Sequence, residues 1–356
     1  GSEQQEIYDI NPDLVLLCGG TDGGNKEVII ANAKHLVAID RPFTTIVAGN
    51  KSANDDIKAI FDEAGKDVVI TANVMPQFNK LNIEPARDAI RQLFISRIIE
   101  AKGLNILQSM TSYKIIPTPL AVLHACELLS KGTKTQQGRG DLLAVDIGGA
   151  TTDVYSMASG EPTVDNTMLK GLPEPWMKRT VEGDLGMRYS LTHVYEQIPG
   201  SDNPENEYMQ QVKAWVELCT AHPDTLAAPG SEEEKLEEFL GRSAVSMAVE
   251  RHCGRIADVY TPLGLMHTQE GKDLMNVPSV IGIGGVLRNS RRPEEILKGS
   301  LYDFMHPECT KPRKPKFYLD QKYIFASMGL LRSINPELAF ELLDKETVEI
   351  GCNATV

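Results

Sequence analysis

The sequence predicts an α/β fold in which helices cover sheets built largely from parallel strands. Two observations carry this prediction. In the N-terminal third, short apolar or β-branched segments alternate with segments of helical periodicity. Further along, apolar segments at residues 142–147 and 279–283 each end at a glycine pair. Strands that alternate with helices favour a parallel sheet with right-handed crossovers.

In the N-terminal third, predicted strands alternate with predicted helices. Strands are expected at residues 13–18, 44–48 and 67–72, and helices at residues 27–36, 55–64 and 85–102. The loop at residues 19–26 reads GGTDGGNK and is no Walker A motif, because Gly24 is followed by Asn25 and not by Lys and Ser or Thr. Its role stays open between a structural strand-to-helix turn and a site for a partner or an anion.

The rest of the chain divides into a strand-rich and a helix-rich part. A helix is expected at residues 119–129, a hairpin from residues 142–147 and 152–157, and a strand at residues 279–283. Ser231 precedes a run of glutamates, which is typical of a helix N-cap, and we expect that acidic run to be a solvated helix face. We therefore predict one domain over residues 1–112 and another over 113–356, with a helical subdomain at about 182–275.

Composition excludes several classes of protein. The net charge of −13 argues against a surface that binds nucleic acid, because phosphate backbones favour Lys and Arg. Since the sequence has no 18-residue apolar run, no membrane-spanning helix is expected. The six cysteines are scattered without a Cys-x-x-Cys pair, which fits free thiols in the cytoplasm.

The strongest chemical signal is the hairpin at residues 143–153, LAVDIGGATTD. Its apolar strand brings Asp146 to the sheet edge, where the carboxylate can hold hydrated Mg²⁺, and Asp153 is a candidate second carboxylate. Glycines let the backbone approach a ligand, and the amides and hydroxyls of the bend can donate to phosphate. The candidate phosphate-binding residues are Gly148, Gly149, Ala150, Thr151 and Thr152. The alternative is an ordinary hairpin, which has no need for this set of polar residues.

This hairpin resembles the second phosphate motif of the actin/Hsp70/sugar-kinase superfamily. Residues 117–125 and 325–331 resemble the two connecting helices of that superfamily. Residues 280–289, VIGIGGVLRN, resemble its adenosine motif, which implies that Gly284 and Gly285 lie beside the nucleotide. The resemblance implies an actin/Hsp70-like, ribonuclease H-like nucleotide-binding domain for residues 113–356. It also implies ATP or ADP with Mg²⁺ as cofactors.

A glycine-punctuated acidic turn, EGDLGMR at residues 182–188, leads into a predicted helix. In the superfamily the matching turn lies near the nucleotide. That resemblance implies that Glu182 or Asp184 meets the ribose and that Gly183 and Gly186 allow close approach. The alternative is a capped helix start with Asp184 near its N-terminus.

Within the superfamily, the chain is most similar to the MutL/GlmL family, which is encoded beside adenosylcobalamin-dependent glutamate mutase. The similar stretches lie at residues 17–28, 145–156 and 179–188. The family shares only a name with the DNA mismatch-repair protein. The resemblance implies an ATP-binding, chaperone-like or reactivating factor, with a cobalamin-dependent mutase subunit as partner.

One departure from the superfamily pattern concerns catalysis. The Asp-x-Gly hairpin of the first phosphate motif does not precede Asp13, and the chain opens with a vector-like Gly1-Ser2. We therefore expect an N-terminally truncated chain in which ATPase activity is weak or absent, and the sequence assigns no catalytic residue. Three alternatives stay open: a metabolic kinase of the same fold, a hydantoinase- or oxoprolinase-type ATP-dependent hydrolase, and a scaffold whose site has decayed.

Overall fold

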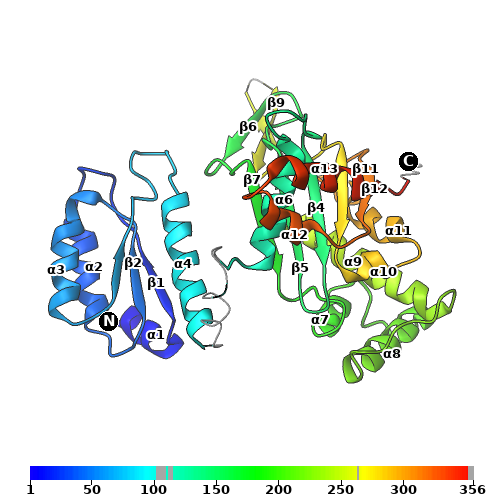
Figure 1. The fold of residues 1–356 in the computed structure, drawn as a ribbon, viewed down its shortest axis with the longest axis horizontal. Coiled ribbons are helices and arrows are strands. Elements are labelled where there is room, and N and C mark those ends of the chain that lie inside the picture. The colour runs from blue at the N-terminus through cyan, green and yellow to red at the C-terminus, as the bar shows by residue number, and fades with distance from the viewer. Residues whose placement is uncertain (102–109, 111–114, 263, 352–356) are drawn as a thin grey trace. The chain divides into compact units, whose positions relative to one another are not determined.

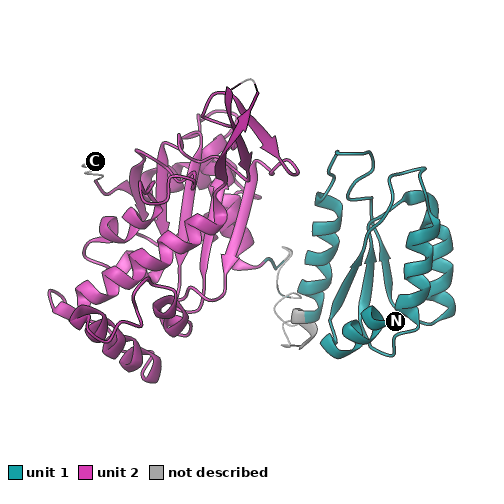
Figure 2. Cartoon of the chain, turned by 180° about the vertical axis from the view of Figure 1, so that it is seen from behind, with its two compact units in different colours: residues 1–116 teal, residues 117–356 magenta. Residues whose placement is uncertain are grey.

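The computed structural model describes residues 1–101, 110, 115–262 and 264–351. The chain forms two compact units, Gly1–Ile116 and Pro117–Val356 (Figure 2). The domain boundary that the sequence predicts, between residues 112 and 113, lies outside the described residues. So does Lys102, at the end of one predicted helix.

Unit 1 is a three-stranded parallel sheet with helices on both faces (Figure 1). Its elements are α1 (Ser2–Ile10), β1 (Leu14–Leu17), α2 (Glu27–Val37), β2 (Thr44–Val47), α3 (Asn54–Glu63), β3 (Val68–Ile70) and α4 (Glu84–Ala101). The strand order is β1-β2-β3, with α2 and α3 on one face and α4 on the other. The predicted alternation of strands and helices is therefore confirmed, with ends shifted by at most two residues.

The core of unit 1 forms where α2 and α3 pack on the sheet. Ile29 and Ala33 lie one turn apart on α2, and Ile57 and Phe61 lie one turn apart on α3, so each pair faces the sheet. All four are buried with Val47 of β2. The helix α1 was not predicted; it buries no residue and so lacks the apolar stripe on which such predictions depend.

Unit 2 is built around a six-stranded sheet in the order β12-β11-β10-β4-β5-β7. The strands of unit 2 are β4 (Leu142–Ile147), β5 (Thr152–Met157), β6 (Thr167–Lys170), β7 (Met177–Glu182), β8 (Arg255–Thr261), β9 (Gly264–Glu270), β10 (Ser279–Ile283), β11 (Lys316–Asp320) and β12 (Thr347–Glu349). Its helices are α6 (Thr118–Lys131), α7 (Leu191–Glu196), α8 (Glu207–Ala221), α9 (Glu232–His252), α10 (Gly285–Asn289), α11 (Pro293–Leu297), α12 (Phe325–Leu331) and α13 (Pro336–Glu346).

The six-stranded sheet combines two kinds of strand pairing. Strands β4, β5 and β7 form an antiparallel meander, and β10 and β11 then add in parallel on the other side of β4. The short strand β12 closes one edge in antiparallel sense. The α/β prediction is therefore confirmed, and the arrangement is compatible with an actin/Hsp70-like, ribonuclease H-like nucleotide-binding fold.

Helices cover both faces of this sheet. Leu143 and Val145 of β4 belong to the core that also contains Leu240 and Ala244 of α9. Because side chains alternate along a strand, Asp146 lies on the opposite face, the side of α6. The two predicted connecting helices, α6 and α12, pack directly on one another. A Cβ atom at Gly329 of α12 would lie 1.8 Å from the Ala121 carbonyl oxygen of α6, so this crossing requires glycine.

One expectation about unit 2 is wrong. The predicted helical subdomain at about 182–275 ends early, because α9 stops at His252 and the chain then forms the β8–β9 hairpin. With β6, this hairpin makes a separate three-stranded sheet in the order β6-β9-β8. Gly254 permits this turn: a Cβ there would lie 2.8 Å from the Glu270 carbonyl oxygen, so the start of β8 lies in close contact with the end of β9. Within the described part of the chain, no helix is both long and apolar enough to cross a membrane.

Candidate functional site

The bend between β4 and β5 is held in place through its carbonyl groups. The Gly148 amide donates to the Thr151 carbonyl at 2.9 Å and closes the turn. The carbonyls of Gly148 and Gly149 accept from the amides of Met187 at 3.0 Å and Arg188 at 2.8 Å. The segment that precedes α7 therefore fixes the shape of the bend without using most of its N–H groups.

Three successive amides of the bend are left without an acceptor. Across the residues that the structure describes, the N–H groups of Gly149, Ala150 and Thr151 donate to no protein group. Gly149 and Thr151 are half-buried and Ala150 is exposed. Consecutive amides in a tight turn form a concavity that binds anions, so the bend can accept a phosphate group.

The two threonines of the bend differ in what their hydroxyls do. Thr152 is buried and its hydroxyl donates to the Leu185 carbonyl, so Thr152 attaches the bend to the next segment. Thr151 is half-buried, and its hydroxyl makes only a long contact of 3.4 Å with Asp153. Of the two hydroxyls predicted to meet phosphate, this placement leaves Thr151 available.

The turn after β7 supports the bend from the other side. A Cβ at Gly186 would lie 2.2 Å from the Ala150 carbonyl carbon, so the two backbones touch. The Ser190 hydroxyl donates to the carbonyls of Ala150 and Gly183, both at 2.9 Å. Gly186 therefore allows the close approach expected of it, although what it approaches here is the bend itself.

Asp146 and Asp153 face each other across β4 and β5, yet their surroundings differ. Asp153 is buried and bound by Arg179, whose Nη2 lies 2.6 Å from its carboxylate. Asp146 is half-buried and accepts no hydrogen bond from the described residues. Burial, and then the charges of Asp153 and Asp320, raise the pKa of Asp146 to about 6 against the opposing effect of Arg179.

Of these two carboxylates, Asp146 is the one suited to hold a hydrated Mg²⁺. No group of three or more His, Cys, Asp or Glu side chains encloses a metal position in the part of the chain described. Magnesium, however, keeps several waters and commonly takes one or two carboxylates together with substrate phosphates. Asp146, a carboxylate without a donor beside two other acids, suits that role, while Asp153 is already neutralised by Arg179.

The second glycine motif meets the first at Asp146. Ile283, the last residue of β10, is the register partner of Asp146, and the chain then turns at Gly284. Gly284 has φ = 99°, and a Cβ there would lie 2.6 Å from Asp146 Oδ1. Glycine is therefore required for both the turn and the carboxylate, and α10 begins immediately afterwards at Gly285.

A cleft of about 800 Å³ joins these parts of unit 2. Gly148 and Gly149 of the bend line it, as does Gly285 at the start of α10. This volume is within the range of small-molecule sites, which run from roughly 300 to 1,000 Å³. The cleft thus brings together the predicted phosphate motif and the predicted adenosine motif.

Sequence reasoning missed the carboxylates of the cleft. Glu234, Glu237 and Glu238 of α9 line it, although the acidic run after Ser231 was expected to be only a solvated face. Glu237 pairs with Arg188 at 2.7 Å, and Glu238 pairs with Arg292. The spacing of three and four residues between these glutamates, which places them on one side of a helix, is the signal that could have found them.

Glu182, Gly183 and Asp184 do not line the cleft. Arg251 near the end of α9 holds both carboxylates, at 2.6 Å from Glu182 and 2.8 Å from Asp184. Hydrogen bonds from Arg251 lower the pKa of Asp184 to about 2. This ion pair gives the two carboxylates a structural partner, so their placement does not support the expected contact with ribose.

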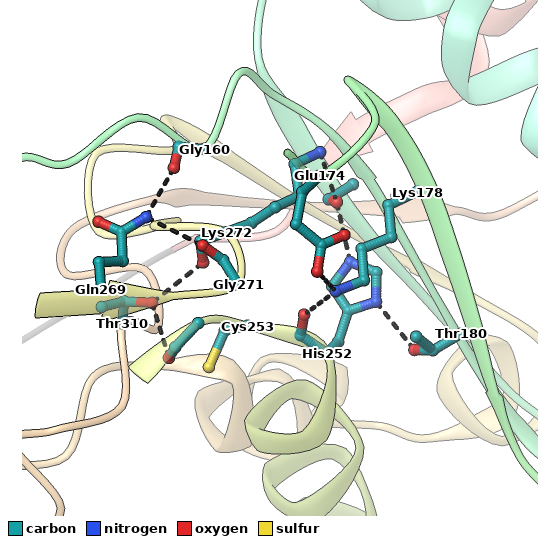
Figure 3. Close-up of polar contacts among 12 residues, drawn as sticks. Gly160, Glu174, Lys178, Thr180, His252, Cys253, Gln269, Gly271, Lys272 and Thr310 are labelled. Atoms are coloured by element: carbon teal, nitrogen blue, oxygen red, sulfur yellow. Dashed lines mark hydrogen bonds and ion pairs between the residues drawn. The ribbon is translucent and has the colours of Figure 1, made fainter. Parts of the chain in front are cut away.

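A second polar cluster in unit 2 joins residues of β5, β7, α9 and the segment after β9 (Figure 3). The Lys272 ammonium is buried and donates to the Trp176 carbonyl at 2.7 Å and the Ser156 hydroxyl at 3.2 Å. The buried His252 ring contacts Ser156 and Thr180, both at 2.8 Å. We call these five residues the Lys272–His252 cluster.

Burial lowers the pKa of both basic groups in the Lys272–His252 cluster and so disfavours their charged forms. Burial, followed by the charge of Lys178, lowers the pKa of Lys272 to about 8. The pKa of His252 lies well below its usual value for the same reasons, so its ring is neutral at physiological pH. Because both ring nitrogens of His252 and the amine of Lys272 have protein partners, this cluster reads as structural.

The glycine-rich loop of unit 1 is held by two buried asparagines. Asn50 accepts from the Gly23 amide at 3.1 Å and donates to the Gly24 carbonyl at 2.9 Å. Asn73 donates to the Gly20 carbonyl at 2.9 Å and to Asp22 at 3.0 Å. These bonds within unit 1 favour the structural alternative for residues 19–26.

Comparison with known proteins finds similarity along nearly the whole chain. A family model described as "MutL protein" matches residues 1–347. Over 351 residues the chain is 46% identical to Protein MutL of Clostridium tetanomorphum, an alignment that covers 98% of this chain and 76% of that protein. The similarity therefore includes both units, the bend and the cleft.

Proposed function

Because the chain belongs to the MutL protein family, we propose that it is an ATP-binding, chaperone-like or reactivating factor for an adenosylcobalamin-dependent mutase of the glutamate mutase type. The geometry of the cleft supports the nucleotide part. The mutase part rests on the family resemblance, since its members are encoded beside such an enzyme.

The observation that carries the nucleotide part is the bend at one end of the cleft. The amides of Gly149, Ala150 and Thr151, which have no acceptor among the described residues, suit a polyphosphate. Asp146 would hold a hydrated Mg²⁺, which neutralises phosphate charge when it is bound. The turn at Gly285 and the glutamates of α9 are left for the nucleoside end.

A nucleotide can regulate a partner only through a difference between two states of the protein. The close crossing of α6 and α12, which depends on Gly329, is a candidate hinge between such states. ATP would shift the balance by its differential affinity for the two arrangements. In one of them the mutase would release its damaged cofactor.

Nucleotide binding is tested by thermal unfolding with Mg·ATP, Mg·ADP, Mg²⁺ alone and no addition. Ligand at ~100 times its Kd adds about 2.7 kcal/mol. For a chain of this size that raises Tm by roughly 5 to 10 °C. Asp146→Ala should keep its fold and lose the shift. A wild-type protein that shows no shift with millimolar Mg·ATP would remove the nucleotide part.

The partner is tested by capture of purified adenosylcobalamin-dependent mutase subunits with and without Mg·ATP. We expect nucleotide-dependent retention of a glutamate mutase subunit. Two control assays address the alternatives: phosphorylated small molecules would favour a metabolic kinase, and substrate-dependent phosphate release would favour an ATP-dependent hydrolase. Failure to retain any such mutase would remove the partner assignment and leave nucleotide binding intact.

A further inference from the structure

Arg188 is a cation at the phosphate end of the cleft. Its amide donates to the Gly149 carbonyl at 2.8 Å, and its side chain lines the cleft. A Cβ at Gly149 would lie 3.7 Å from Arg188 Cβ, so the arginine packs directly against the bend. A phosphate bound by the free amides of the bend would therefore lie next to a positively charged residue.

The guanidinium of Arg188 is held in place by three backbone carbonyls in addition to Glu237. It donates to the carbonyls of Met187 at 2.6 Å, Thr225 at 3.0 Å and Pro223 at 3.2 Å. The side chain is only 15% exposed. Three fixed carbonyl acceptors orient the guanidinium, so its position does not depend on an acidic partner.

The acidic partner that Arg188 does have is exchangeable. Glu237 of α9 lies 2.7 Å from Arg188 Nη2 and is 24% exposed, so its carboxylate can turn toward water. Arginine binds phosphate as readily as carboxylate, often through two parallel bonds. A phosphate carries more charge than Glu237 and would be repelled by it at short range.

We propose that Arg188 exchanges Glu237 for a phosphate oxygen of the bound nucleotide, which breaks this ion pair between α9 and the phosphate bend. The inference rests on the proposed function and adds a regulatory step to the same site. It gives the nucleotide a contact that differs between the free and bound states, as any shift of population requires. Because β8 follows α9 in the chain, the three-stranded sheet lies directly downstream of the helix that carries Glu237.

The test is Glu237→Gln, with affinities for Mg·ATP and for adenosine measured by calorimetry. Glutamine keeps an acceptor for Arg188 and removes the competing charge. We expect Mg·ATP to bind roughly tenfold more tightly, a typical effect of one charge-assisted hydrogen bond. Adenosine, which has no phosphate, should bind as it does to the wild type.

Glu238→Gln is the matched control. Glu238 lies on the same helix, lines the same cleft and pairs with a different arginine, Arg292. Its substitution should change the affinity for Mg·ATP by less than about threefold, because it frees no cation at the bend.

The outcomes separate this inference from the proposed function. If the wild type binds Mg·ATP and Glu237→Gln leaves that affinity unchanged or weaker, the exchange is wrong while nucleotide binding stands. Equal tightening by Glu237→Gln and Glu238→Gln, or tightening of adenosine as well, would also overturn the exchange. A wild type that binds no nucleotide removes both.

Discussion

Two groups of polar residues in unit 2 differ in whether they have hydrogen-bond partners within the protein. In the Lys272–His252 cluster, the amine and both ring nitrogens have protein partners within 3.2 Å. At the bend after β4, no described residue accepts from the amides of residues 149–151, and none donates to Asp146. Both groups lie against the same sheet, and the bend lines the cleft of about 800 Å³.

This difference separates structure from function. Buried polar groups that satisfy one another stabilise a fold and leave nothing for a ligand. Polar groups without partners cost stability and persist where a ligand completes them. Substitutions in the Lys272–His252 cluster should therefore lower the free energy of unfolding and leave nucleotide affinity unchanged. Substitutions of the polar groups at the bend should mainly lower nucleotide affinity.

The largest effect is expected from His252→Ala in the Lys272–His252 cluster. It removes a buried ring and with it one hydrogen-bond partner each of Ser156 and Thr180. We expect the free energy of unfolding to fall by about 3 kcal/mol, with the affinity for Mg·ATP unchanged. Denaturant melts and calorimetry measure the two quantities.

His193→Ala is the control for this variant, because that ring is 65% exposed and its removal should cost less than about 0.5 kcal/mol. If His252→Ala instead weakened nucleotide binding at unchanged stability, the cluster would have to be counted as part of the site.

A slightly smaller effect is expected from pH acting on Lys272. Its pKa is about 8 in the folded protein, against an ordinary value of 10.5. Between these values the unfolded chain binds more protons, so the free energy of unfolding rises with pH through this window. The full change is on the order of 2 to 3 kcal/mol. Other groups also titrate there, so Lys272→Met is the reference and should lack this part of the slope.

Melts of both proteins at pH 7, 8, 9 and 10 measure the difference. Parallel curves for the wild type and Lys272→Met would show that the amine is not desolvated as the structure has it.

Next to the bend, Gly284→Ala should lower both the stability of the protein and its affinity for Mg·ATP. The residue has φ = 99°, and the added methyl would lie 2.6 Å from Asp146 Oδ1. We expect a loss of about 1 to 2 kcal/mol in unfolding free energy and a clear loss of affinity for Mg·ATP. At Gly285 the nearest atom to such a methyl is 3.9 Å away, so Gly285→Ala should not lower stability. Equal stability of the two variants would contradict the close approach at Gly284.

The sequence predicted best the parts that local chemistry determines. The bounds predicted for β4 and β5 agree with the structure, because an apolar strand, two glycines and a return strand leave one arrangement open. The N-cap of α9 is also as predicted, since Ser231 accepts from the Glu234 amide at 3.3 Å. Local spacing and residue type were sufficient for both.

The partners of several carboxylates could not be predicted, because they depend on tertiary packing. Whether Glu237 faces water or a cleft depends on where Arg188 lies, and the two are far apart in the chain. Likewise, the pairing of Glu182 and Asp184 with Arg251 joins the end of α9 to the turn after β7. Strand β7 itself was missed, because its sequence MKRTVE is too polar to stand out.

The most direct test of the central claim is one variant, Asp146→Asn, measured for both Tm and affinity for Mg·ATP. The pKa of Asp146 is raised to about 6, so its charge destabilises the ligand-free protein at pH values above that. We predict that the amide variant is more stable by about 1 to 2 kcal/mol at pH 7.5 and has lost Mg²⁺-dependent nucleotide binding. A lower Tm with unchanged affinity for Mg·ATP would contradict the assignment of this carboxylate to a ligand.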